Sequence, residues 1–160
     1  MAQQKWRPAL LMISIVLSSA AFAGEKTNMT QATGTFDVSM TPASEAAEEA
    51  GVTLGQFSLT KTFTGDMVGN ASGQMLTATS AVKGSAGYVA IERFSGTVHG
   101  KNGTFVLQHT GTMQGQSQAL TITIVPDSGT GELAGISGTF KLQIDEGTHH
   151  YTLEYSLPEG

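Results

Sequence analysis

The sequence has no cysteine, few charged residues and only one long apolar run. Because cysteine is missing from all 160 residues, disulfide bonds, thiol catalysis and thiolate metal ligands are excluded. Only 13% of the residues are charged, and 13 acidic residues outnumber 8 lysines and arginines. An acidic chain is a poor partner for nucleic acid, so we predict none. The length suits one domain whose stability comes from a packed core.

The apolar run belongs to a segment with the pattern of a secretory signal peptide, residues 1–23. Lys5 and Arg7 precede the run ALLMISIVLSSAAF, and the small residues AFA end the segment. The run is shorter than the roughly 20 residues of a membrane-spanning helix. We therefore predict cleavage before Gly24, a tail over 24–32, and a mature protein that is soluble in the periplasm and has no membrane partner. Loss of Lys5 and Arg7 takes the formal charge from −5 to −7.

The remaining chain alternates apolar and polar residues in short runs separated by glycine, which is typical of antiparallel β-structure. We predict one all-β domain over 33–158. Its eight strands are expected near 33–41, 56–66, 73–82, 87–98, 103–114, 118–126, 138–145 and 149–156. The segment TPASEAAEEAG is the one helical candidate, because Thr41 fits an N-cap, Pro42 a first helical position and Gly51 a C-terminal stop.

Two predicted turns indicate which strand faces belong together. In HGKNGTF, a turn at Lys101-Asn102, or at Asn102-Gly103, pairs even-numbered residues of one strand with odd-numbered residues of the next. A turn at Glu146-Gly147 relates the last two strands in the same way. The predicted inward face then carries large apolar and aromatic residues, among them Phe57, Leu59, Phe63, Tyr88, Phe105, Leu107, Tyr151 and Tyr155.

Three ionisable residues, Lys61, Glu92 and His109, share this inward face. Burying a charge costs several kcal/mol unless the charge is paired, so we expect the three to meet one another, water or a ligand. The first of the two turns pairs His109 with Phe94 and makes Glu92 its diagonal neighbour; the second places His109 opposite Gly96. An eight-stranded closed barrel holds side chains or one small ligand inside and leaves no sheet edges, so we predict a barrel rather than a sandwich.

The segments YVAIERFSGTVHGKNGTFVLQHTG and VPDSGTGELAGISGTF resemble a family of small bacterial proteins known as domain of unknown function 3224. The resemblance covers about 30–158 and rests on Tyr88 and Glu92 in one strand, His109 in the next, and the glycine-rich loop SGTGELAG. Members are similar in fold to the plant allene oxide cyclase barrel. The resemblance therefore implies a calycin-like antiparallel barrel of eight strands, at most one short helix, an interior pocket and no established reaction. Many relatives start near the position of Met29 without an export signal.

Other chemistries fit the sequence less well. The loop GTGELAG lacks the lysine of a phosphate-binding loop and is flanked by strands, so we expect its glycines to serve backbone geometry. Asp127, just before it, stands where the family is expected to have glycine. No G-x-S-x-G pattern indicates a hydrolase. Glu92, His109 and His149 form a metal set that strand geometry permits, but we predict no metal and no cofactor, and we expect His99 and His150 to be exposed to solvent.

Two functional interpretations from different classes remain. In the first, the barrel binds a small hydrophobic or amphipathic ligand between aromatic walls, with Lys61 as a counter-charge. In the second, Glu92 acts as acid, base or hydrogen-bond anchor with His109 as its partner, in an isomerisation, cyclisation or hydration without a cofactor. A third, structural interpretation treats the polar residues as an internal network. The predicted ligand-binding residues are Lys61, Tyr88, Phe57, Phe63, Phe105 and Tyr151, and the predicted catalytic residues are Glu92 and His109. The outward Val89, Ile91 and Val106 leave the oligomeric state open.

Overall fold

A computed structural model describes residues 28–159, most of which lie in strands. The predicted signal peptide lies outside these residues, and the first strand begins within the predicted tail. The strands are β1 (Thr30–Pro42), β2 (Ala47–Glu49), β3 (Val52–Gly65), β4 (Met67–Ser80), β5 (Ala86–Val98), β6 (Lys101–Gln114), β7 (Ser117–Ile124), β8 (Ser137–Asp145) and β9 (Thr148–Ser156). Within residues 28–159, the only helical element is a single 3-10 turn, η1 (Gly131–Leu133). None of these residues forms a helix that could span a membrane.

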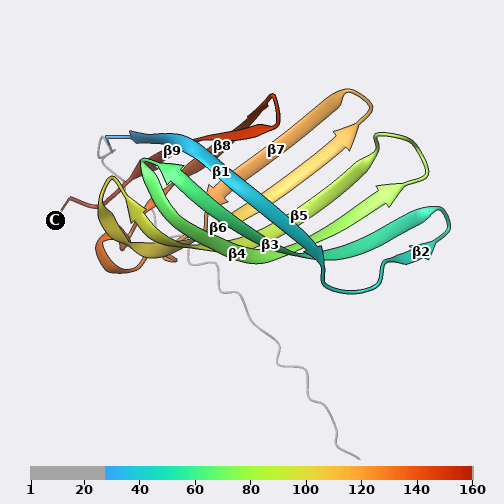
Figure 1. Ribbon diagram of the computed structural model, residues 1–160, viewed down its shortest axis with the longest axis horizontal. Coiled ribbons are helices and arrows are strands. Elements are labelled where there is room, and N and C mark those ends of the chain that lie inside the picture. The colour runs from blue at the N-terminus through green and yellow to red at the C-terminus, as the bar shows by residue number, and fades with distance from the viewer. Residues whose placement is uncertain (1–27, 160) are drawn as a thin grey trace, which may run out of the picture.

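The strands form a closed antiparallel barrel, as predicted (Figure 1). Each strand from β3 to β8 pairs with the next, and β1 pairs with both β9 and β3, so eight strands complete the ring. The short β2 pairs with the first residues of β3. The contact between β7 and β8 is the narrowest, with the single pair Thr123 and Thr139.

Side-chain alternation along the strands separates the interior from the surface. On β3, Leu59, Lys61 and Phe63 are buried, and the alternating Ser58, Thr60 and Thr62 are exposed. This confirms the predicted facing of that strand. The same rule on the other strands produces a core of apolar side chains: Phe63, Met67, Phe94, Val98, Phe105, Leu107, Phe140, Tyr151, Leu153 and Tyr155.

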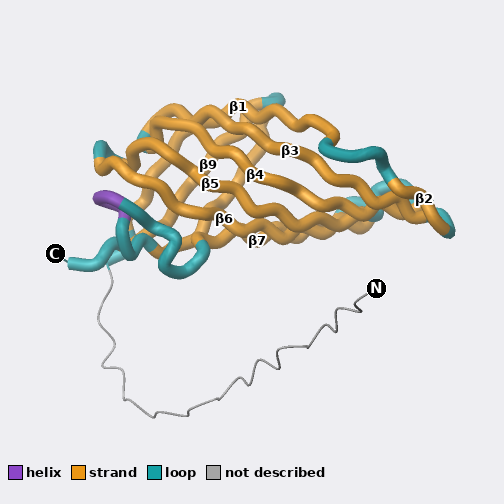
Figure 2. Tube along the Cα trace, turned by 90° about the horizontal axis from the view of Figure 1, so that it is seen from below, coloured by secondary structure: helices purple, strands orange, loops and turns teal. Residues whose placement is uncertain are grey.

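The two ends of the barrel differ. The hairpins β4–β5, β6–β7 and β8–β9 mark one end, called here the open end (Figure 1). At the other, the closed end, the segment 125–136 carries η1 and lies beside the C-terminus (Figure 2). Thr130 donates its backbone N–H to Thr104 O (2.9 Å), and the side chains of Leu133 and Ile136 are fully buried. The glycine-rich loop therefore closes the barrel, in keeping with its predicted structural role.

The predicted turn between β5 and β6 is wrong in both of its alternatives. Val98 pairs with Lys101, so the turn is His99-Gly100, with φ values of 47° and 78° that fit a type I′ turn. The glycine that suggested the later turn, Gly103, serves another purpose: a Cβ there would overlap Thr130 O of the closing segment. The predicted turn at Glu146-Gly147 is present, because Asp145 pairs with Thr148.

The predicted helix over 41–51 is also wrong. This segment contains the end of β1, a bend and β2. Ala43 N donates to Gln56 O (2.8 Å), which keeps the chain beside β3 beyond Pro42. A tight turn at Ala50-Gly51 then folds β2 onto β3, and these cross-strand hydrogen bonds take the place of helical ones.

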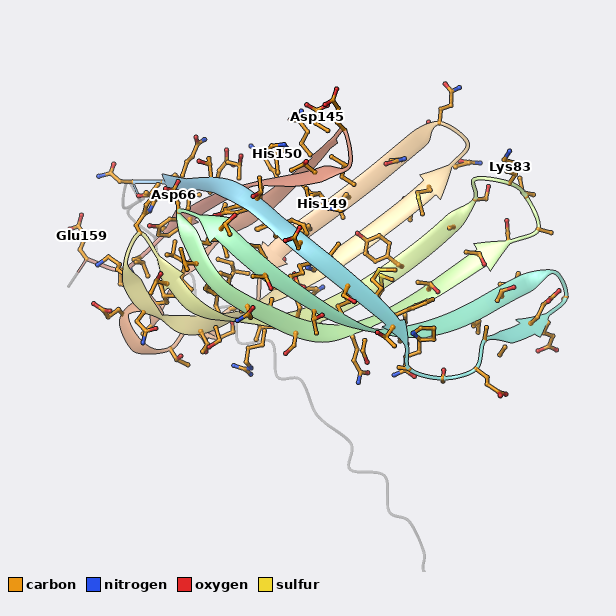
Figure 3. The ribbon with its side chains drawn as sticks, in the orientation of Figure 1. Asp66, Lys83, Asp145, His149, His150 and Glu159 are labelled. Atoms are coloured by element: carbon orange, nitrogen blue, oxygen red, sulfur yellow. The ribbon has the colours of Figure 1, made fainter. Side chains whose placement is uncertain are left out.

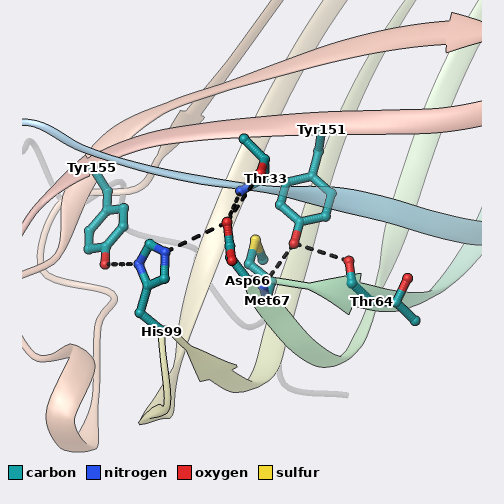
Figure 4. Close-up of polar contacts among 7 residues, drawn as sticks. All are labelled: Thr33, Thr64, Asp66, Met67, His99, Tyr151 and Tyr155. Atoms are coloured by element: carbon teal, nitrogen blue, oxygen red, sulfur yellow. Dashed lines mark hydrogen bonds and ion pairs between the residues drawn. The ribbon is translucent and has the colours of Figure 1, made fainter.

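A polar cluster holds β1 to the turns of the closed end (Figure 4). Asp66, between β3 and β4, accepts a hydrogen bond from Thr33 N (2.7 Å). His99 has Nε2 at 3.6 Å from Asp66 Oδ2 and Nδ1 at 2.8 Å from Tyr155 Oη. The side chain of His99 is 36% exposed and His150 is also exposed, as predicted, although both ring nitrogens of His99 lie near polar partners.

Candidate functional site

A cavity of about 420 Å³ occupies the interior on the open-end side of the core. Its lining includes Thr79, Ala86 and Met113, which lie next to the hairpins of the open end. Most of its wall is aromatic or aliphatic. The apolar lining residues are Phe36, Val38, Met40, Phe57, Leu59, Met75, Ala86, Ala90, Met113, Ile122, Phe140 and Leu142.

Two nitrogen-bearing side chains deep in this lining, Lys61 and His109, share one buried carboxylate. Lys61 Nζ lies 2.7 Å from Glu92 Oε1, and His109 Nε2 lies 2.9 Å from the same oxygen. Exposed fractions are 1% for Glu92, 5% for His109 and 8% for Lys61. Lys61 and His109 line the cavity and Glu92 does not, so the carboxylate lies behind the two groups that a ligand would meet. The structure thus brings together the three ionisable residues of the predicted site.

Small residues on the intervening strand allow this meeting. Lys61 is on β3 and Glu92 on β5, so the lysine must reach across β4, whose inward positions there are Ala71 and Gly73. A Cβ on Gly73 would overlap the backbone and Cβ of Glu92, so a side chain at Gly73 would displace the carboxylate. His109 reaches Glu92 diagonally, because it pairs with Ala90 on β5.

The network favours the ionised form of Glu92. Burial raises the pKa of this carboxyl, but the hydrogen bond from His109 and the charge of Lys61 oppose it and hold the pKa below its ordinary value. The charged carboxylate accepts hydrogen bonds only, so His109 donates through Nε2–H, and in the neutral ring Nδ1 is then an acceptor. Glu92 Oε2 is buried without a hydrogen-bond partner among the described residues.

Aromatic rings surround the polar groups. Lys61 Nζ lies 4.8 Å from the centroid of the Phe36 ring, and His149 stacks on the same ring at 5.1 Å between centroids. Burial, together with the charge of Glu92, raises the pKa of Tyr88, so its phenol keeps its proton. The site combines ammonium, imidazole and phenol groups with apolar walls, which suits the orientation of a polar group on an otherwise apolar molecule.

The predicted ligand-binding residues divide between the cavity and the core. Phe57, Tyr88 and Lys61 line the cavity. Phe63, Phe105 and Tyr151 do not. Phe63 and Phe105 pack on Phe94, and Tyr151 packs on Phe63, with ring centroids 5.0 to 5.6 Å apart in the closed end. These three predicted residues therefore lie in the packed aromatic core and not in the lining of this cavity. Tyr151 instead uses its hydroxyl to accept from Met67 N and donate to Thr64 O.

Several lining residues were not predicted, notably Phe36, Met40, Met75, Met113 and His149. These residues alternate with polar neighbours in the sequence, and this alternation indicates that their side chains point inward. It does not distinguish inward positions beside a cavity from inward positions in the packed core. His149 and His150 are consecutive residues of β9 (Figure 3). His149 lines the cavity, and His150 is exposed.

The structure does not assemble the metal set that strand geometry permitted. His149 stacks on Phe36, whereas Glu92 is bonded to Lys61 and His109. Within residues 28–159, no group of three or more carboxylate or imidazole side chains is arranged to hold a metal ion.

Comparison with known proteins identifies the family. The model of a family described as "Protein of unknown function (DUF3224)" matches residues 32–155. A crystal structure of a DUF3224 protein of unknown function from Shewanella oneidensis MR-1 is 45% identical and has a TM-score of 0.78, covering 82% of this chain and 99% of that chain. No curated protein gives a significant match. The likeness to allene oxide cyclase stays a prediction. The chain belongs to the DUF3224 family.

Proposed function

We propose that this barrel binds one small apolar or amphipathic molecule in its interior. The observation that carries the proposal is the cavity of about 420 Å³ with a largely apolar wall and two nitrogen-bearing groups deep inside. Its size falls within the range of roughly 300–1,000 Å³ typical of small-molecule sites. Apolar contact supplies the affinity, and Lys61, His109 and Tyr88 orient the polar part of the ligand.

The unpartnered oxygen of Glu92 argues against a network selected for stability alone. A buried acceptor without a donor costs about 1–3 kcal/mol. Stability alone does not require ionisable residues at these three positions, because replacing a buried ion pair with well-packed apolar side chains is often neutral or stabilising. A polar group kept beside a cavity at such a cost fits a binding role.

The place of action that we propose is the periplasm, on the strength of residues 1–23. Lys5, Arg7, the apolar run and the AFA site form a complete export signal. N-terminal sequencing of protein recovered from cell fractions tests this. A periplasmic chain beginning near Gly24 supports it, and an intact chain beginning at Met1 in the cytosol contradicts it.

Binding is tested with a neutral fluorescent probe, N-phenyl-1-naphthylamine, and a pair of matched variants. Ala86 and Val89 lie on the same strand; the first lines the cavity near the open end and the second is exposed on the outside. We expect saturable binding to the wild type, at least about tenfold weaker binding to Ala86→Phe, and unchanged binding to Val89→Phe. Absence of saturable binding to the wild type, or equal binding by both variants, would contradict the proposal.

A second candidate function is catalysis without a cofactor in the same cavity. The observation that favours it is the imidazole of His109, held by a buried ionised carboxylate, an arrangement that fixes a general base. The proton acceptor would then be His109, with Glu92 as its positioning residue. Native mass spectrometry of the protein from its own periplasm identifies a bound molecule. If that molecule is converted, Glu92→Gln and His109→Ala should lose the conversion; a molecule recovered unchanged leaves binding as the function.

A further inference from the structure

The basic side chains of this site line the cavity, and its acidic side chain does not. Three side chains that carry nitrogen, Lys61, His109 and His149, line it. Among the described residues, no aspartate or glutamate side chain does so. The acid associated with this site, Glu92, has a side chain that is 0% exposed and lies behind Lys61. A molecule in the cavity therefore meets ammonium and imidazole groups before it meets any carboxylate.

The ion pair of Lys61 and Glu92 has no net charge, but its positive and negative ends point in different directions. Its positive end reaches the cavity wall, and its negative end is buried in the barrel. One N–H of the Lys61 ammonium is bonded to Glu92 Oε1, and the ring of Phe36 lies beside the same ammonium at 4.8 Å. An ammonium carries three N–H donors, so donors remain for an acceptor in the cavity. Between apolar walls the attraction of this end for an anion is stronger than in water.

We propose, on the basis of the binding function above, that the ligand is an amphiphile with a single anionic head group, such as a carboxylate or sulfonate. The head group contacts Lys61 and His109 deep in the cavity. The apolar part extends toward the open end, where Met40, Phe57, Met75 and Met113 supply adaptable thioether and ring surfaces. Cationic amphiphiles bind more weakly, because their head group faces the ammonium of Lys61 and no carboxylate lines the cavity.

Head-group preference is measured by displacement of N-phenyl-1-naphthylamine with three compounds that share one chain: decanoate, decanol and decylamine. The pH is chosen so that decanoate is ionised and decylamine is protonated. We expect decanoate to displace the probe at a concentration about tenfold or more below that of decylamine, with decanol between them. The wild-type series decides the proposal by itself, whether or not any variant folds.

Two variants assign the preference to the oriented pair. Lys61→Met combined with Glu92→Gln removes both buried charges together, and we expect it to retain the probe and lose most of the preference for decanoate. Lys141→Met removes a lysine from an exposed pair with Glu154 and should leave the preference unchanged. Equal displacement by the three compounds, with the probe bound, overturns this inference and leaves the binding function standing. Failure of the wild type to bind the probe overturns both.

Discussion

The ring of Tyr88 lies against the backbone of Gly111, the residue directly opposite on β6. A Cβ on Gly111 would overlap three atoms of this ring. The glycine thus gives Tyr88 a place on the cavity wall, and the ring in turn covers backbone that would otherwise be exposed inside the barrel.

Gly111→Ala should displace the Tyr88 ring from its place. We expect the free energy of unfolding to fall by about 1–3 kcal/mol, because an added methyl group in a packed site forces neighbouring side chains to move. Gly87→Ala is the control on the adjoining strand, since the nearest atom to its added methyl group, Gly111 O, is 3.7 Å away. Its effect should stay within about 0.5 kcal/mol. Urea denaturation compares the two; equal losses would show that the Tyr88 contact is not special.

Lys61→Met should be among the most damaging single changes in the barrel. It leaves the carboxylate of Glu92 buried without its ammonium partner, which costs about 3–5 kcal/mol in comparable cases. Adding Glu92→Gln to this variant should restore part of the loss, because no unpaired charge then remains inside. Lys141→Met, in the exposed pair with Glu154, should cost about 0–1 kcal/mol. If the Lys61→Met variant were as stable as the wild type, the prediction would be contradicted, and water or His109 would have to compensate fully for the lost charge of Lys61.

The pKa of Glu92, held below its ordinary value in the folded barrel, makes its contribution depend on pH. A carboxyl with a depressed folded pKa stabilises the fold above the unfolded pKa of about 4.3, and this stabilisation is lost as the pH falls through the lower, folded pKa. The stability difference between the wild type and Glu92→Gln should therefore shrink on acidification below pH about 4. Urea denaturation of both proteins over this range tests the prediction, and a difference that is constant with pH would contradict it.

Asp66 should add a second acid-sensitive contribution, at the closed end. The backbone N–H of Thr33 holds the pKa of Asp66 below its ordinary value, with smaller help from the Thr33 hydroxyl and from His99. The stabilisation is present above the unfolded pKa and is lost as the pH falls through the folded one. Asp66→Asn should flatten the fall in thermal stability in acid. Asp37→Asn, on the exposed surface of β1, removes the same charge without this contact and should retain the wild-type pH profile.

The facing of the residues was predictable from the sequence, and their exact partners were not. The predicted turn at Lys101-Asn102 and the observed turn at His99-Gly100 differ by two positions, which shifts the pairing by an even number of residues. An even shift leaves every side chain on its own face. The partner of His109 moves by four residues, from Phe94 to Ala90; because Glu92 lies two residues from each, it remains the diagonal neighbour of His109.

The division of the interior into cavity and core was not predictable in this way. Alternation places Phe57 and Phe63 on the same face of β3, but only the packing of distant strands decides that the first borders a cavity and the second a cluster of rings. Depth along the barrel depends on strand stagger and on the segment that closes one end. Neither the stagger nor the closing segment produces a periodic pattern in the sequence.

The closure of the barrel by β1 also sets an order on how the chain can fold. Gly34 pairs with Gly65 on β3 and with Tyr151 on β9, so one partner lies nearby in sequence and the other close to the end of the chain. The pairing with β3 can form early, but the pairing with β9 has to wait until the last strand is available, and such distant contacts slow folding. Until then β1 and β9 present open edges on which a second chain can add, and this period is when aggregation competes with folding.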